Sequence, residues 1–243
     1  MNDTQGSADF GHALRAFVLC GGLGMRLRSV VSDRPKSMAL IGDVPFLQLL
    51  LQGLRGQGVR DVILGTGYRA DQIEKFFGSG ETVGLRLHYS QEDAPLGTGG
   101  ALKLAEELLS DPVVVMNGDS YVEWSLVAMT DLFFQKNADI VMVLQEVPDV
   151  SRYGSVTVDS EGGVAEFVEK GSRTGAGLIN AGIYLLRKGI VGGLAAGTAI
   201  SLERDVFPEF LGKKFYGLIS RGTFIDIGVP ADLERAQTVL RSV

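Results

Sequence analysis

A regular alternation between short apolar runs and amphipathic stretches, starting at residue 14, most constrains how this chain can fold. The apolar runs of the first half predict strands at 14–20, 59–64, 85–91 and 113–116. Between them, apolar residues at helical spacing predict helices at 46–54, 71–77 and 101–109. Neighbouring parallel strands need crossover connections, which helices commonly supply, so this order predicts a largely parallel sheet covered by helices.

The second half of the chain is richer in strands. Strand-like runs at 155–158, 164–168 and 183–186 are separated by glycine-rich turns, and a last helix is predicted at 231–240. We therefore expect an α/β fold of three layers, with a predominantly parallel (Rossmann-like) mixed sheet flanked by helices and a β-rich second half. No internal repeat or low-complexity linker interrupts the chain, so we expect a single domain over 14–243 behind a flexible N-terminal extension, 1–13.

The composition excludes several classes of protein. The chain has 23 basic and 29 acidic residues and a net charge of −6, which argues against a nucleic-acid binder. Its polar N-terminus lacks a signal-peptide core, and no stretch approaches the roughly 18 apolar residues of a membrane span. The single cysteine, Cys20, fits a reducing compartment, and two histidines cannot build a histidine-rich zinc site. We expect a cytoplasmic protein that binds neither nucleic acid nor membranes, and we leave a homo-oligomer open.

The segment from Cys20 to Leu27, Cys-Gly-Gly-Leu-Gly-Met-Arg-Leu, follows the first predicted strand. Ligands of open α/β sheets lie beyond the carboxyl ends of strands, and glycines let backbone N–H groups approach a phosphate closely. A dinucleotide fingerprint requires glycine at Leu27, and a P-loop requires Lys-Ser/Thr instead of Arg26-Leu27. Cationic residues follow within ten positions: Arg26, Arg28, Arg34 and Lys36. The pattern favours a triphosphate site, and the alternative is a tight turn with surface arginines.

Two aspartates stand next to apolar segments. Asp119 follows the predicted strand 113–116, and Asp226 lies between Ile225 and Ile227. An ionised carboxylate in such a place is costly unless it is paired. Two carboxylates suit Mg²⁺, which takes a few protein oxygens and completes its octahedron with phosphates and water. Each aspartate alone is equally well explained as a helix N-cap or a turn residue.

The glycine segment, followed by Arg34-Pro35-Lys36-Ser37-Met38, resembles the signature of the sugar-phosphate nucleotidyltransferases. Further segments extend the resemblance over almost the whole chain: Pro95–Ala101, Asn117–Asp119, Arg152–Gly154, Phe167–Lys170, Asn180–Tyr184 and Phe224–Gly228. This family joins a nucleoside triphosphate to a sugar 1-phosphate and releases pyrophosphate. Cys20 and Met25 depart from its usual signature, and Met25 removes a hydroxyl that could touch phosphate. The narrower resemblance is to the branch that transfers guanylyl groups to a heptose 1-phosphate; it is carried by Ser29–Asp33, Ser201–Glu203 and Ile225–Pro230.

The resemblance implies a role for each site residue. The catalytic residues are Arg26 on the β- and γ-phosphates, Lys36 between the α-phosphate and the sugar phosphate, and Asp119. Asp119 and Asp226 are the implied ligands of Mg²⁺. The implied nucleotide contacts are Leu19, Gly21, Gly22, Gly24, Met25, Glu92, Gly97 and Thr98. The implied sugar-phosphate contacts, in the β-rich half, are Gly154, Glu169, Lys170, Asn180 and Glu203. Tyr184, Phe224 and Trp124 are expected to be packing residues.

Glu92 favours guanine, because an ionised carboxylate only accepts hydrogen bonds and guanine presents two adjacent donors, N1–H and N2–H₂. If the alignment slips by one residue, Asp93 takes this place. The alternative to a base contact is that Glu92 is a solvated acid at a strand end. Uracil and thymine present one donor beside two acceptors, and a glutamine amide matches that pattern better.

The expected reaction joins GTP to D-glycero-α-D-manno-heptose 1-phosphate and gives GDP-sugar and pyrophosphate. The alternatives within the family are guanylyl, thymidylyl or uridylyl transfer to mannose or glucose 1-phosphate, and uridylyl transfer to N-acetylmuramate 1-phosphate. A glycosyltransferase that uses nucleotide sugars is less well supported because it leaves Arg26 and Lys36 unexplained. A nucleotide-binding regulator without activity is disfavoured because Lys36 and both aspartates are present.

Overall fold

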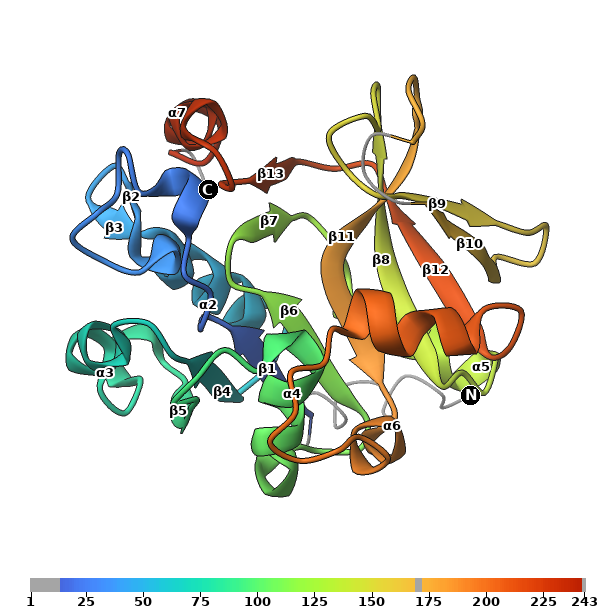
Figure 1. Cartoon of the computed structure of the whole chain (residues 1–243), viewed down its shortest axis with the longest axis horizontal. Helices are drawn as coiled ribbons and strands as arrows, with labels where there is room; N and C mark the ends of the chain where they lie inside the picture. The colour runs from blue at the N-terminus through green and yellow to red at the C-terminus, as the bar shows by residue number, and fades with distance from the viewer. Residues whose placement is uncertain (1–13, 169–171, 242–243) are drawn as a thin grey trace, which may run out of the picture.

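The computed structural model describes residues 14–168 and 172–241. Its centre is a nine-stranded sheet, with helices packed against both faces (Figure 1). The residues of β1 (Arg15–Leu19) show the two faces, because Ala16 and Val18 belong to one hydrophobic core and Phe17 to a second. A sheet between two cores makes three layers, so the expected fold class is confirmed. The expected N-terminal extension, 1–13, lies outside the described residues, and the single-domain expectation stays a prediction.

The sheet has a parallel half around β1. Strand β1 pairs in parallel with β4 and β6, and β4 pairs in parallel with β5. All of β4 and most of β6 are buried, because helices cover both faces of these strands. The bounds are β4 (Asp61–Thr66), β5 (Arg86–Gln91) and β6 (Val113–Asn117). The strands expected at 14–20, 59–64, 85–91 and 113–116 are confirmed, with ends shifted by one or two residues.

The other half of the sheet is mostly antiparallel and is organised by one long strand, β11 (Gly177–Leu186). The second part of β11 pairs with β6, its first part with β9, and its other edge with β8. The remaining strands are β8 (Ile140–Val147), β9 (Ser155–Val158), β10 (Val164–Val168) and β12 (Phe215–Ser220). The β-rich second half is confirmed; sequence reasoning missed β8 and β12 and recognised only the end of β11.

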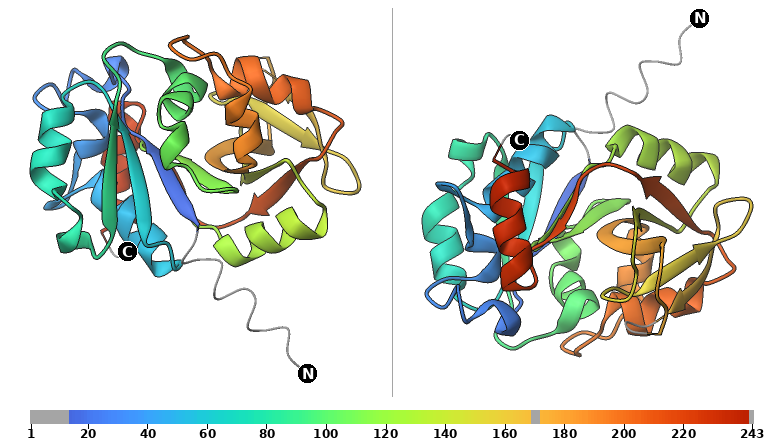
Figure 2. Two further views of the ribbon diagram at one scale, coloured as in Figure 1. Left: turned by 90° about the horizontal axis from the view of Figure 1, so that it is seen from below. Right: turned by 90° about the horizontal axis from the view of Figure 1, so that it is seen from above.

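Helices occupy the connections between strands, as Figure 2 shows from both sides of the molecule. They are α2 (Phe46–Gly56), α3 (Ala70–Phe77), α4 (Gly97–Leu104), α5 (Leu126–Gln135), α6 (Lys188–Gly192) and α7 (Pro230–Val239). The helices expected at 46–54, 71–77 and 231–240 are confirmed. None of the helices in the described residues is long and apolar enough to cross a membrane.

The helix expected at 101–109 is shifted. Helix α4 begins earlier, at Gly97, and ends at Leu104, and a separate 3₁₀ turn follows at Glu106–Leu108. The early start is possible because Gly99 and Gly100 have no side chains: a Cβ on Gly99 would lie 2.9 Å from the Ile200 side chain. The N–H group of Gly99 donates instead to the Ile200 carbonyl at 2.8 Å.

Two small antiparallel sheets lie beside the main one. Strand β2 (Leu40–Ile41) pairs with β3 (Val44–Pro45), and β7 (Ser120–Val122) pairs with β13 (Phe224–Asp226). The second pair brings the end of the chain back to the segment that leaves β6. Helix α7 then lies near β2, at the same end of the molecule (Figure 1).

Candidate active site

The glycine segment, Lys36 and the two predicted metal ligands gather near the carboxyl ends of β1 and β6. These strands are parallel and in register, with Leu19 opposite Asn117. The glycine segment leaves β1 and Asp119 leaves β6, and the N–H group of Gly118 donates to the Leu19 carbonyl at 3.0 Å. A Cβ on Gly118 would lie 2.6 Å from that carbonyl oxygen, so glycine is required for this close approach. The site therefore lies where open α/β sheets bind ligands.

The pairing of β7 with β13 brings the two aspartates together. Asp226 lies opposite Ser120, the residue that follows Asp119. The Ile227 N–H group donates to the Asp119 carbonyl at 2.9 Å, and the Gly228 N–H group donates to Oδ1 of Asp226 at 2.7 Å. The two carboxylates thus meet although they lie far apart in the sequence.

Lys36 faces both carboxylates. Its Nζ atom lies 2.7 Å from Oδ2 of Asp119 and 3.9 Å from Oδ1 of Asp226. The lysine side chain is only 13 % exposed, so its position is defined by its surroundings. Gly24 packs against it: the backbone of Gly24 is left-handed, with φ of 58°, and a Cβ there would lie 3.0 Å from Cβ of Lys36. The loop conformation and the lysine position are therefore linked.

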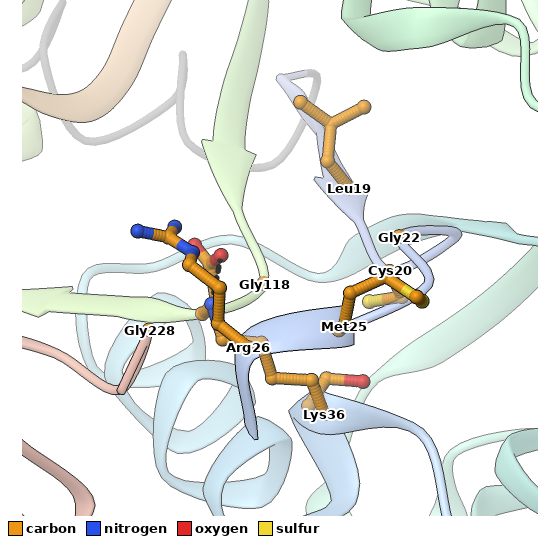
Figure 3. A pocket seen from close by; sticks show the side chains of 11 residues that line it. Leu19, Cys20, Gly22, Met25, Arg26, Lys36, Gly118 and Gly228 are labelled. Atoms are coloured by element: carbon orange, nitrogen blue, oxygen red, sulfur yellow. Dashed lines mark hydrogen bonds and ion pairs between the residues drawn. The ribbon is translucent and has the colours of Figure 1, made fainter. Parts of the chain in front are cut away.

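Two adjoining cavities open at this place, and they share Leu19, Gly22 and Asp119. The first, here called the loop cavity, is lined by Leu19, Cys20, Gly22, Gly24, Met25, Arg26, Lys36, Ser37, Gly118, Asp119 and Gly228 (Figure 3). The second, here called the Glu92 cavity, is lined by Leu19, Gly21, Gly22, Leu23, Gly65, Glu92, Pro95, Gly97, Thr98, Ala101, Asn117 and Asp119. All eight residues expected to contact nucleotide line one cavity or the other.

The four cationic residues between positions 26 and 36 do not all line the same cavity. Only Arg26 and Lys36 line the loop cavity, where Figure 3 shows Arg26 extended away from Leu19 and Cys20. Arg28 lies over the Tyr68 ring, 5.0 Å from its centroid, and Arg34 pairs with its neighbour Asp33. Arg28 and Arg34 therefore do not add to the charge of the loop cavity, because spacing in a loop does not determine the direction of side chains.

The backbone of the glycine segment is available to a ligand. Within the described part of the chain, the N–H groups from Gly21 to Met25 have no acceptor, whereas those of Cys20 and Leu27 donate to carbonyls. Such successive N–H groups form an anion-binding concavity. Met25, which stands where the family usually has threonine, is 63 % exposed and lines the cavity, but its side chain adds no hydrogen-bond donor to that of its backbone N–H group.

Glu92 lies at the wall of the second cavity rather than in solvent. Its Oε2 atom accepts a hydrogen bond from the Leu96 N–H group at 3.0 Å. Its Oε1 atom lies 2.4 Å from where a Cβ on Gly21 would stand, so the carboxylate occupies the space that glycine leaves empty. Asp93 is exposed and is not part of this wall. Of the two acids considered from sequence, Glu92 is the one that borders the cavity.

The expected sugar contacts are only partly described. Glu169 and Lys170 lie outside the described residues. Gly154 lies beside the end of β10, since a Cβ there would be 3.2 Å from the Val168 carbonyl oxygen. The Asn180 amide donates to the Tyr184 hydroxyl at 2.8 Å and accepts from the Gly182 N–H group at 2.8 Å.

Glu203 lies in a π-helical turn, Leu202–Val206, and accepts hydrogen bonds from protein hydroxyls rather than standing free. The donors are Thr98 and Ser201, each at 2.9 Å, and Tyr184 at 3.1 Å. A carboxylate has about four acceptor positions, so one remains. Tyr184 is completely buried, but its hydroxyl takes part in this network, which the expectation of a packing role did not include. Sequence spacing carries no signal for it.

Cys20 is the only thiol of the chain and borders the loop cavity. Burial raises the pKa of this thiol to about 12, so it stays protonated at neutral pH. A protonated, buried thiol is a poor nucleophile. The site thus offers cations, carboxylates and backbone N–H groups, which suit the alignment and charge neutralisation of phosphates rather than covalent catalysis.

The chain belongs to the nucleotidyl transferase family: the family model described as "Nucleotidyl transferase" matches residues 15–242. Among its relatives are two D-glycero-alpha-D-manno-heptose 1-phosphate guanylyltransferases. The protein of Aneurinibacillus thermoaerophilus is 43 % identical over 94 % of this chain and 99 % of its own. That of Campylobacter jejuni subsp. jejuni serotype O:2 is 39 % identical over 90 % of this chain and 96 % of its own. The mannose-1-phosphate guanylyltransferase of Mycobacterium tuberculosis is 36 % identical over 94 % of this chain, which spans 65 % of that protein.

Solved structures agree with this assignment. HddC from Yersinia pseudotuberculosis is 37 % identical and superposes with a TM-score of 0.85, covering 94 % of this chain and 100 % of its own. The same protein complexed with GMP-PN superposes with a TM-score of 0.84. The family and the resemblance drawn from the sequence motifs are confirmed.

Proposed function

We propose that this protein joins GTP to D-glycero-α-D-manno-heptose 1-phosphate and releases pyrophosphate. The observation that carries the proposal is the position of Lys36 between Asp119 and Asp226, beside a glycine segment whose N–H groups from Gly21 to Met25 have no acceptor in the described part of the chain. The two relatives that resemble this chain over nearly their whole length are named for this guanylyl transfer. A phosphate oxygen of the sugar attacks the α-phosphorus of the triphosphate, and pyrophosphate leaves in line.

The chain's own residues neutralise and align the reactants. Both reactants are anionic, so their repulsion is part of the barrier, and fixed cations lower it. The ammonium group of Lys36 has three N–H donors and gives one to Asp119, which leaves donors for phosphoryl oxygens. The guanidinium of Arg26 makes no ion pair with any described residue and suits the departing pyrophosphate.

The donor set at the site fits Mg²⁺. No group of three or more histidine, cysteine, aspartate or glutamate side chains in the described residues surrounds a common point. Mg²⁺ is commonly bound by one or two carboxylates together with substrate phosphates, and Asp119 and Asp226 supply that number. When bound, the ion would screen phosphate charge and help to fix the α-phosphate. In the protein without a bound ion, the ammonium group of Lys36 lies near both carboxylates and offsets their mutual repulsion.

Glu92 supports guanine as the base. Its carboxylate borders the second cavity and still has acceptor positions beyond the one that Leu96 uses. The N1–H and N2–H₂ donors of guanine match such an acceptor, whereas uracil and thymine present one donor between two acceptors. The GMP-PN complex of the Yersinia pseudotuberculosis protein agrees with a guanine nucleotide.

Mannose 1-phosphate is the second candidate substrate, because the mycobacterial relative is named for it. A panel of GTP, UTP, dTTP and ATP against heptose, mannose and glucose 1-phosphates, with pyrophosphate as the readout, separates the candidates. We expect GTP with the heptose phosphate to give the highest kcat/KM. A higher kcat/KM with mannose 1-phosphate would reject the heptose as the substrate, and a higher kcat/KM with UTP would reject guanine as the base. If no combination of substrates released pyrophosphate, the proposed reaction would be rejected.

A further inference from the structure

A chain of hydrogen bonds behind the Glu92 cavity has no part in the mechanism above. It starts at the Asn180 amide, which donates to the Tyr184 hydroxyl at 2.8 Å, and Tyr184 donates to Oε1 of Glu203 at 3.1 Å. Oε2 of Glu203 accepts from Thr98 at 2.9 Å. The chain thus joins β11, the π-helical turn and the first turn of α4.

The direction of each hydrogen bond is determined by the donors and acceptors present. Oγ1 of Thr98 accepts from the Leu202 N–H group at 2.7 Å, so its one hydrogen points to Glu203. The Tyr184 hydroxyl accepts from Asn180 and gives its hydrogen to the same carboxylate. Burial raises the pKa of Tyr184 well above its ordinary value, so this hydroxyl stays a donor. Both ends of the chain therefore need an acceptor at Glu203, and only a carboxylate accepts on both oxygens.

Of the residues in this chain, only Thr98 lines either cavity. Thr98 follows Gly97, whose backbone is left-handed with φ of 70°, and a Cβ on Gly97 would lie 2.5 Å from the Ile200 carbonyl oxygen. At the other end, Gly182 follows Asn180 with φ of 78°, and a Cβ there would lie 2.6 Å from Nδ2 of Asn117. The chain thus connects the first turn of α4, which lines the Glu92 cavity, with the part of β11 that lies next to Asn117.

We propose that Glu203 is a positioning residue that couples the nucleotide side of the site to the sugar side. Its carboxylate holds Thr98 in place for the nucleotide and, through Tyr184, fixes the Asn180 amide, which the family resemblance assigns to the sugar side. A change at Tyr184, which is completely buried and lines neither cavity, is then transmitted to nucleotide binding. This inference rests on the proposed function, because it assumes that the second cavity receives the nucleoside.

Calorimetric titration with GTP tests the coupling in the full chain. Loss of a hydrogen bond to a charged group corresponds to roughly a tenfold or larger change in an equilibrium constant. We therefore expect the Kd for GTP to rise about tenfold in Glu203→Gln and in Tyr184→Phe. The double variant should be no worse than Glu203→Gln, because Tyr184 acts through Glu203. Thr98→Val removes the hydroxyl that donates to Glu203 and should raise the Kd as well.

Tyr89→Phe is the matched control. It also removes a tyrosine hydroxyl that donates a hydrogen bond, here to the Gly78 carbonyl at 2.7 Å, and should leave the Kd unchanged. A thermal melt of each variant separates stability from coupling. Glu203→Gln and Tyr184→Phe with a lowered Tm and wild-type Kd would show a merely structural role and overturn the inference. A wild-type protein that binds no GTP would instead reject the proposed nucleotide. The titrations would then be repeated with the triphosphate that the enzyme uses, and unchanged Kd values in the variants would reject the coupling as well.

Discussion

The Nζ atom of Lys36 lies 2.7 Å from Oδ2 of Asp119, although 83 positions separate the two residues in the sequence. Two features of the fold produce this contact. The parallel pairing of β1 with β6 places the segments that follow them side by side, and the left-handed backbone of Gly24 leaves room for the lysine stem. The approach of Asp226 from the far end of the chain completes the group, so one cation and two acids are fixed before any substrate arrives.

Lys36→Ala should reduce kcat by about a hundredfold or more, because it removes a preorganised cation where negative charge must be matched. The protein should remain folded, since an ion pair with a partly exposed aspartate contributes little to stability. Pyrophosphate release and a thermal melt check the two statements. Arg34→Ala is the control: it also removes a cation from this segment, but one that pairs with exposed Asp33, and its activity should match wild type. A fully active Lys36→Ala enzyme would remove the proposed role.

Asp226→Asn should raise the Mg²⁺ concentration needed for half-maximal activity by at least about tenfold, because it removes one of two anionic ligands. The amide oxygen can still accept the Gly228 N–H group, which donates to Oδ1 at 2.7 Å, so the loop should keep its shape. Activity measured against Mg²⁺ concentration checks this. Asp33→Asn removes the same charge from an exposed position and should leave the curve unchanged. Identical curves for Asp226→Asn and wild type would argue against the metal assignment.

The parts of the fold with a strong periodic signal could be predicted from sequence. The buried parallel strands, the helix at 46–54 and the ligand edge after 14–20 all follow from apolar runs and the residues that end them. What could not be predicted depends on contacts between distant segments. Helix α4 begins at Gly97, within a run of glycines that leaves room for Ile200. Ile200 is about 100 positions away in the sequence, so the residues around Gly97 do not indicate this contact.

The candidate site, too, could be predicted only in part from the sequence. The residue types and the sheet edge were predictable, because charge and glycine content can be counted along the chain. The directions of side chains were not: Arg28 and Arg34 turn to Tyr68 and Asp33, outside the cavity. The hydroxyl network of Glu203 needs a π-helical turn in contact with α4 and a tyrosine of the irregular strand β11, and the spacing of residues along the sequence predicts neither.

Glu92→Gln should lower kcat/KM for GTP by about ten- to a hundredfold, because the amide replaces part of an acceptor with a donor that faces the guanine N–H groups. Activity with UTP should fall less, which narrows the preference between the two nucleotides. Steady-state kinetics with both triphosphates measure the ratio. Asp93→Asn serves as the control, since Asp93 is exposed and does not line the cavity. If Asp93→Asn changes the preference and Glu92→Gln does not, the base contact belongs to the neighbouring acid.

Gly24→Ala should lower activity more than stability alone explains. The alanine must adopt the φ of 58° that Gly24 has, which costs about 1 kcal/mol. Its Cβ would also lie 3.0 Å from Cβ of Lys36, so the lysine must move. Because a displacement of about 1 Å can reduce a rate a hundredfold, we expect a loss of at least about tenfold in kcat. Gly42→Ala has nearly the same φ, 59°, but its nearest neighbour is 3.9 Å away, at Arg241. Gly42→Ala should lower Tm and keep kcat. Equal kcat values for the two variants would contradict the claim that the loop conformation at Gly24 determines the position of Lys36.

The stability of the protein should depend on pH through Asp61, which lies on β4 away from the site. Its hydrogen bonds with the Arg86 guanidinium lower the pKa of this carboxyl below its ordinary value of about 4. A lowered folded-state pKa stabilises the folded state fully above the unfolded-state pKa, and this contribution is lost as pH falls through the folded-state value. Asp61→Asn should therefore be less stable than wild type in urea unfolding at pH 7, with a smaller difference near pH 3. A difference that is the same at both pH values would contradict the assignment of the lowered pKa to this pair.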